Sequence, residues 1–148
     1  MLLLSPDMAL HLIKLCVGVD SIEELADWQA RRLRDLKRRK KPLELRHVTR
    51  MTPKRKDELL AGGSLYWIIR GYTTVRQELI DLRPAVKDGI PSCAIVYAPP
   101  LIPVARRAHR PFQGWRYLKG NEAPKDLPKG AINLPQELQR TLSELGLL

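Results

Sequence analysis

Apolar residues along the chain gather in short runs separated by glycine and proline, a pattern typical of β-strands. Residues 9–17 form the first run and end before Gly18, which predicts a buried strand. Residues 43–50 alternate partly between apolar and polar side chains and predict a second strand. Further strands are predicted at residues 64–70, 72–82, 92–98 and 101–105.

Helix signals are confined to three segments. Ser21 and Glu24 have the spacing of a capping box, so a helix is expected from Ser21 to about residue 40. Thr52 and Pro53 begin a short helix over residues 53–61, which a pair of glycines ends. Residues 133–145 predict a C-terminal amphipathic helix.

This order of elements predicts an α+β fold, because runs of strands follow the helices instead of alternating with them. The sheet is expected to be mixed or antiparallel, and a half-open small barrel would satisfy the same order. Residues 8–148 are expected to form a single domain, since 148 residues is a common size for one hydrophobic core. Met8 offers an alternative start, in which case residues 1–7 would be an unstructured extension.

The composition is that of a globular protein, with 44% hydrophobic and 28% charged residues. No apolar run is long enough to cross a bilayer, and the N-terminus lacks the features of a secretory signal. The protein is therefore expected to be cytoplasmic, without a membrane partner. Cys16 and Cys93 lie in apolar runs and are expected to be buried free thiols.

Positive charge is concentrated in one part of the chain. The net charge is +10, and residues 31–56 contain thirteen basic side chains against two acidic ones. The remaining 122 residues are almost neutral, with thirteen basic and fourteen acidic side chains. A near-neutral protein with one basic segment indicates a localised anionic partner.

The first helix and the segment that follows it supply the candidate phosphate contacts. Arg31, Arg34 and Arg38 have a spacing that places them on the face of the helix opposite its apolar residues. The following segment adds Arg46, Arg50, Lys54 and Arg55. Alternatively, the basic helix face is simply solvated and its arginines pair with nearby acids.

A second candidate segment interleaves aromatic and basic side chains. Arg110, Trp115 and Arg116 are candidate nucleic-acid contacts, because aromatic rings can stack on bases while cations hold the backbone. The alternative is that Phe112, Trp115 and Tyr117 form a clamp that packs this segment onto the core.

The leading hypothesis is a non-catalytic nucleic-acid-binding module, with RNA as the favoured partner. An adaptor for an acidic protein is one alternative. Another is a phosphodiester-processing enzyme that uses His47 and Thr49, which match half of the paired His-x-Thr pattern of two-histidine phosphoesterases. No phosphate loop, serine elbow, Cys-x-x-Cys pair or metal-ligand spacing occurs, so no cofactor, metal or catalytic residue is assigned.

Several sequence blocks resemble a family of small proteins from alphaproteobacteria that is known as a domain of unknown function. The blocks are LHLIKLCVGVDS, TRMTPKR, GGSLYWIIRG, RQELIDL and RPFQGWRYL. The resemblance covers about residues 8–127 and implies no activity. The GGSLYWIIRG strand and the order of elements are also loosely similar to RNA-binding domains of the pseudouridine-synthase-and-transglycosylase type, which is a fold analogy only.

Overall fold

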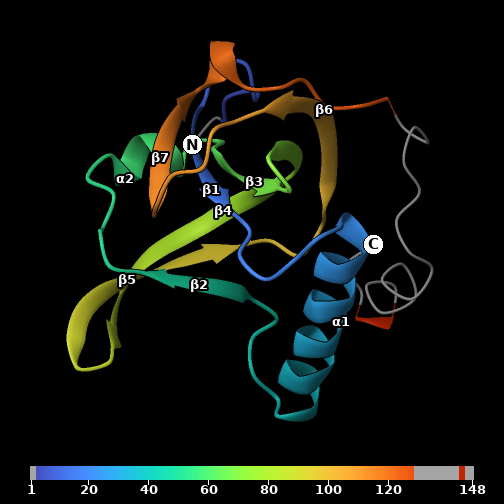
Figure 1. The fold of residues 1–148 in the computed structure, drawn as a ribbon. Coiled ribbons are helices and arrows are strands. Elements are labelled where there is room, and N and C mark those ends of the chain that lie inside the picture. Colours follow the sequence, from blue (N-terminus) through green and yellow to red (C-terminus); the bar gives the residue numbers. More distant parts are fainter. Residues whose placement is uncertain (1–2, 129–143, 146–148) are drawn as a thin grey trace.

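The structure is a computed structural model that describes residues 3–128 and 144–145. Seven strands, two α-helices and one 3-10 turn occur within these residues (Figure 1). The strands are β1 (Leu10–Leu15), β2 (Leu45–Thr49), β3 (Ser64–Ile69), β4 (Tyr72–Lys87), β5 (Ile90–Tyr97), β6 (Ile102–Ala108) and β7 (Trp115–Lys119). The helices are α1 (Ile22–Arg38) and α2 (Lys56–Leu59), and the 3-10 turn is η1 (Gly120–Glu122).

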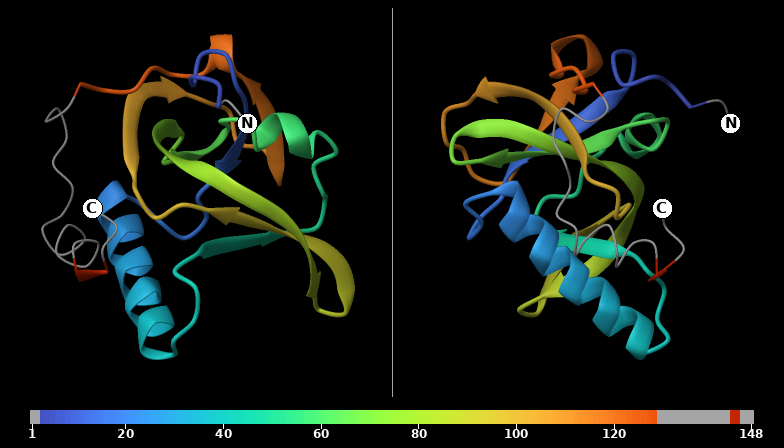
Figure 2. Two further views of the ribbon diagram at one scale, coloured as in Figure 1. Left: turned by 180° about the vertical axis from the view of Figure 1, so that it is seen from behind. Right: turned by 90° about the vertical axis from the view of Figure 1, so that its right-hand side faces the viewer.

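The strands form one sheet in which neighbours follow the order β2-β5-β4-β3-β1-β7, while β6 pairs with β4. Only the β1–β3 pair is parallel among these described strands. The first half of β4 pairs with β3 and β6, and its second half pairs with β5. Bulges near Thr74 and Ile80 shift the register, as expected where a long strand bends. The β4–β5 hairpin projects beyond the rest of the sheet (Figures 1 and 2).

Alternate residues of the central strands pack into two apolar clusters, as the period of two of a β-strand requires. On one face, Leu65 and Trp67 of β3 pack with Ile95 of β5 and with the apolar side of α1, including Leu33. On the other face, Tyr66 and Ile68 pack with residues of β1, β6 and β7. The sheet is therefore buried on both faces of β3.

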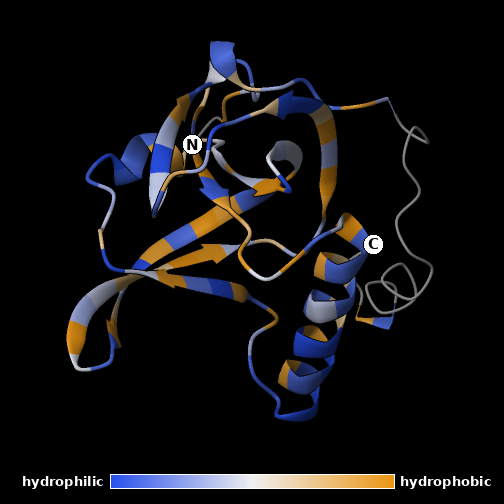
Figure 3. Cartoon of the chain, viewed as in Figure 1, coloured by the Kyte–Doolittle hydropathy of each residue, from blue (hydrophilic) through white to orange (hydrophobic). Residues whose placement is uncertain are grey.

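The helix predicted from Ser21 is present as α1. Ser21 is its N-cap and accepts a hydrogen bond from the Glu24 N–H at 3.1 Å, while Glu24 accepts one from the Asp20 N–H at 3.0 Å. Leu25, Ala26 and Leu33 are buried on the side that faces the sheet. The opposite side and the turn that follows the helix are hydrophilic (Figure 3). The capping box and the 3.6-residue period thus fix both the start and the orientation of α1.

The predicted α+β class with three helices is wrong, although the sheet is mixed as expected, with β1–β3 parallel and the other described pairs antiparallel. Strands make up 42% of the described chain and helices only 20%. The short helix expected over residues 53–61 is limited to the four residues of α2, which begins after Arg55 and ends at Leu59. Strands β4 and β6 continue beyond their predicted ends, and residues 115–119 add β7. The predicted C-terminal helix, residues 133–145, lies outside the described residues except for 144 and 145.

The strands predicted between residues 62 and 96 are confirmed as adjacent members of one sheet, β3, β4 and β5. Cys16 and Cys93 are free thiols, as predicted, but only Cys93 is fully buried, while Cys16 is partly exposed. Burial raises the pKa of the Cys16 thiol to about 11, so it is not a thiolate at neutral pH. Among the described helices, none combines the length and hydrophobicity that a membrane crossing requires.

The two end strands of the sheet are joined through the segment that follows β2. The Trp115 indole N–H in β7 donates a hydrogen bond to the Met51 carbonyl at 2.7 Å. The Tyr117 hydroxyl accepts hydrogen bonds from the backbone N–H groups of Lys54 at 3.0 Å and Arg55 at 3.2 Å. Residues 51–55 are therefore held against β7, close to the site described next.

Candidate functional site

A cleft lies between the end of β1, strand β2 and the first half of α1. It consists of two adjoining cavities that share Val17 and His47 in their walls. The first, the aromatic cavity, has a volume of about 330 Å³, and its lining includes Trp28, Arg46, His47, Trp67 and Tyr97. The second, the cationic cavity, has a volume of about 580 Å³, and its lining includes Lys14, Thr49, Arg50, Lys87 and Trp115.

Two buried aromatic rings form the fixed wall of the aromatic cavity. The rings of Trp67 and Tyr97 meet edge to face, with centroids 5.8 Å apart and planes at 74°. The Trp67 indole N–H donates a hydrogen bond to Gln77 Oε1 at 2.9 Å. Gln77 in turn exchanges two hydrogen bonds with Gln29 of α1, at 2.9 and 2.8 Å. Both glutamines are fully buried, so the orientation of Trp67 is determined by a satisfied polar network.

The rest of the aromatic cavity is lined by a more accessible ring and by His47. Trp28 on α1 is 44% exposed, which is unusual for so large an apolar side chain beside a cavity. The His47 ring meets Trp67 edge to face, with centroids 6.0 Å apart. No hydrogen-bond partner for either ring nitrogen of His47 occurs within residues 3–128. His47 therefore presents one donor and one acceptor that the protein itself does not use.

Lys14 is the least expected member of the cationic cavity. Its place in β1 is opposite Trp67 of β3 and Trp115 of β7, and only 9% of its surface is exposed. No carboxylate or other hydrogen-bonding group of the described chain pairs with its ammonium group. Burial, and secondarily Lys87, lowers the pKa of Lys14 below its ordinary value. Lys14 lines the cavity, so its unpaired charge is available to an anionic ligand.

All charged side chains that line the cleft are cationic. Lys14, Arg50 and Lys87 line the cationic cavity and Arg46 lines the aromatic cavity. In the described chain, neither lining contains an aspartate or a glutamate. A cavity walled by cations alone concentrates the field and attracts anions. The cleft is thus suited to a negatively charged ligand with an apolar or aromatic part.

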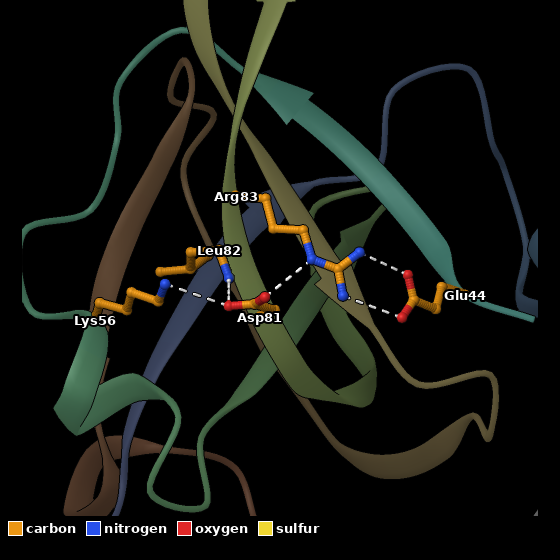
Figure 4. Close-up of polar contacts among 5 residues, drawn as sticks. All are labelled: Glu44, Lys56, Asp81, Leu82 and Arg83. Carbon is orange, nitrogen blue, oxygen red and sulfur yellow. Dashed lines mark hydrogen bonds and ion pairs between the residues drawn. The ribbon is translucent and has the colours of Figure 1, made fainter. Parts of the chain in front are cut away.

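The carboxylates nearest to β2 are already neutralised outside the cleft. Arg83 of β4 binds both carboxylate oxygens of Glu44, at 2.8 and 3.1 Å, and also donates to Asp81 at 2.9 Å (Figure 4). Asp81 also pairs with Lys56 at 3.3 Å. The Arg83 guanidinium holds the pKa of the Glu44 and Asp81 carboxyls below their ordinary values. This network ties the start of β2 to β4 and so positions Arg46 and His47.

A larger cavity elsewhere, of about 600 Å³, has a different chemistry. Its walls come from the N-terminal segment, α2, the end of β7 and η1, and they include three acids, Asp7, Asp57 and Glu58, beside two cations, Arg55 and Lys119. Arg55 is engaged by Glu58. Although this cavity is slightly larger than either cavity of the cleft, its mixed charge makes it a poorer match for an anionic ligand.

Three of the ten predicted contact residues lie in the cleft. Arg46, Arg50 and Trp115 line it. The three arginines predicted on the first helix, Arg31, Arg34 and Arg38, are exposed on the outer side of α1 and line neither cavity. Lys54, Arg55 and Arg110 are also exposed and line neither cavity. The Arg116 guanidinium lies over the Phe112 ring, 4.3 Å from its centroid.

The histidines do not assemble a two-histidine phosphoesterase site. His47 and Thr49 both line the cationic cavity, but His11 and His109 do not. His11 is buried, accepts a hydrogen bond from the Ser64 N–H at 2.9 Å and contacts the Pro6 carbonyl at 2.6 Å. His109 pairs with Thr73 at 3.0 Å. In the part of the chain that the structure describes, no group of His, Cys, Asp and Glu residues is arranged to hold a metal ion.

A family model described as a protein of unknown function (DUF1489) matches residues 12–148. The chain belongs to this family. The resemblance found in the sequence blocks is thereby confirmed. No curated protein and no solved structure gives a significant match. The cleft of this DUF1489 protein therefore has to be interpreted from its own residues.

The cleft residues that the sequence did not predict lie on strands that are far apart in the sequence and become neighbours only in the folded sheet. Lys14, Trp67 and Lys87 lie outside the basic segment and carry no local motif. Trp28 carried one usable signal, because it lies on the polar half of the amphipathic helix, where a large aromatic residue is unusual. The other residues of the DUF1489 cleft could be predicted only from the register of the sheet, which determines which residues of different strands lie side by side.

The stability of the DUF1489 protein should depend on His47 at mildly acidic pH. Burial, with Lys14 and Lys87 as further causes, lowers the pKa of His47 to about 4, and Arg46 and Arg50 add positive charge to the same cleft. An unfolded imidazole titrates near pH 6.5. As the pH falls from about 6.5 to about 4, the unfolded state gains the proton first, so folding stability decreases.

His47 should account for on the order of 1 kcal/mol of this loss of folding free energy, because solvent screens the electrostatic interactions of its half-buried imidazole. Urea unfolding at pH 7 and pH 4.5 measures the loss in the wild type and in His47→Phe. The variant should lose less stability than the wild type. Equal losses in the two proteins would contradict the low pKa of His47, since His11 and His109 are unchanged in both.

Proposed function

We propose that the protein is a non-catalytic nucleic-acid-binding module that favours RNA, and that the cleft holds the sugar–phosphate backbone. The observation that carries this proposal is Lys14, whose side chain is largely buried and lines a cavity walled by other cations, and whose ammonium group has no protein partner in the described chain. Phosphate would supply the missing negative charge. A charge-assisted contact of this kind is stronger than a neutral hydrogen bond.

The same cleft favours a nucleic acid over an acidic protein. An acidic peptide would use the cations but would leave the adjoining aromatic cavity without a function. A single strand combines phosphates with flat bases, which suits a surface of cations next to aromatic rings. RNA is the favoured strand because its loops and ends commonly present unpaired bases to proteins.

Binding measured against salt concentration tests the class of partner. We expect the fluorescence anisotropy of a labelled single-stranded RNA to report binding whose log affinity falls by about 2 to 3 per log unit of salt, at about 0.7 for each of the four cleft cations. Single-stranded DNA of the same sequence should bind more weakly, and polyglutamate should bind weakest. Intact RNA after incubation agrees with a non-catalytic role. Tighter binding of polyglutamate, or the absence of salt-dependent RNA binding, would refute the proposal.

A further inference from the structure

The aromatic cavity has the chemistry of a pocket for one flat, uncharged ring system. Its volume of about 330 Å³ lies at the lower end of the range of small-molecule sites. The Trp67 ring is held in place by Gln77, and Trp28, which also lines the cavity, is exposed enough to contact a ligand. A wall of fixed aromatic rings with one accessible ring can bind a planar group by stacking at a low entropic cost.

The polar groups of the same cavity suit the edge of a nucleobase. The cavity lining contains no carboxylate in the described chain, and His47 has a ring donor and a ring acceptor without protein partners. Arg46 adds further donors. A nucleobase edge presents donors and acceptors side by side, so a neutral imidazole can pair with it where a second cation could only donate.

The position of the cavity relative to Lys14 links a base to its phosphate. The aromatic and cationic cavities share Val17 and His47, and Lys14 is opposite Trp67 in the sheet. A ligand that fills both cavities therefore has a flat part and an anionic part next to each other. A nucleotide has both, whereas an acidic side chain or a free phosphate has only the anionic part.

We propose that the aromatic cavity holds a single unstacked nucleobase, whose phosphate lies in the cationic cavity near Lys14. This inference rests on the proposed function and adds the part of the nucleic acid that enters the protein. Unstacking one base of a single strand costs little free energy, and stacking of that base on protein rings offsets the cost. The protein would thus bind at unpaired positions of RNA and not along a duplex.

A comparison of nucleoside 5′-monophosphates with ribose 5-phosphate tests the base pocket directly, because the two ligands differ only in the base. Quenching of tryptophan fluorescence and calorimetry give the affinities. We expect the best nucleotide to bind about 5- to 150-fold more tightly than ribose 5-phosphate, the range expected for stacking of one base. In Trp28→Ala this preference should fall several-fold, while the affinity for ribose 5-phosphate should stay the same.

Tyr72→Ala is the matched control, since Tyr72 is an aromatic residue 41% exposed on β4 that lines neither cavity. It should keep the full preference, and thermal unfolding confirms that both variants are folded. Salt-dependent RNA binding without a base preference would overturn the base pocket and leave the proposed function standing. A base preference that Trp28→Ala abolishes, without RNA binding, would support the pocket and overturn the proposed function. A preference that survives in Trp28→Ala would place the base elsewhere.

Discussion

Removing three cleft charges together should lower the affinity for single-stranded RNA by about 100-fold near 0.1 M salt. The variant is Lys14→Met, Arg50→Gln and Lys87→Gln, which neutralises the cations that line the cationic cavity. Each phosphate contact to a single strand contributes about 0.7 to the slope of log affinity against log salt. The slope should therefore decrease by about 2, and anisotropy titrations at several salt concentrations measure both changes.

The matched control removes the same number of charges from the outer side of α1. Arg31→Gln, Arg34→Gln and Arg38→Gln changes the net charge equally, but these residues line neither cavity. Long-range attraction alone should make the loss of affinity in this variant small, because exposed charges are screened beyond about 10 Å at 0.1 M salt. If the helix variant lost more affinity and slope than the cleft variant, α1 and not the cleft would be the phosphate-binding surface.

The stability of the cleft variant separates a binding role from a structural one. The Lys14 side chain is largely buried and has no partner in the described chain, so Lys14→Met replaces it with an apolar side chain of similar shape and removes an unpaired charge. A residue kept for packing would destabilise the protein when it is replaced. A residue kept for binding an anion should leave stability unchanged or increase it, since functional sites often reduce stability.

Local features of the sequence were sufficient to predict the elements that depend on short-range signals. The capping box at Ser21 and the spacing of Leu25 and Leu33 fixed α1, because both act within a few residues. The β-branched and aromatic runs after Gly63 predicted β3 and its neighbours. The fold class was wrong because it depends on how far each element extends. That length is determined by pairing with distant strands, as β4 shows with its three partners.

The site was predicted only in part, for a related reason. Charge density along the chain identified Arg46 and Arg50, which do line the cleft. The same signal selected the arginines of α1, whose helical positions turn them away from it. Lys14 and Trp67 are 53 residues apart and become neighbours only through the parallel pairing of β1 and β3. A single basic residue in an apolar strand was the one local sign of Lys14, and it is equally typical of a strand end.

The buried pair of Gln29 and Gln77 behind the aromatic cavity should contribute more to the free energy of unfolding than any exposed ion pair of the described chain. Replacing Gln77 by leucine removes the acceptor for the Trp67 indole N–H and both hydrogen bonds with Gln29. It also removes the donors to the Ala98 and Pro99 carbonyls. Each buried group left without a partner costs about 1 to 3 kcal/mol. Gln77→Leu should therefore lower the free energy of unfolding by about 3 to 5 kcal/mol, measured by urea denaturation.

The double variant Gln29→Leu with Gln77→Leu shows whether the two amides act as a pair. Because it leaves neither glutamine without its partner, it should cost less than the sum of the single variants, with a coupling energy of about 1 to 3 kcal/mol. Gln113→Leu is the surface control and should change stability by less than about 0.5 kcal/mol, since Gln113 is exposed. Additive costs of the two single variants would mean that the glutamines act separately. The Trp67 indole would then be held by Gln77 without a contribution from Gln29.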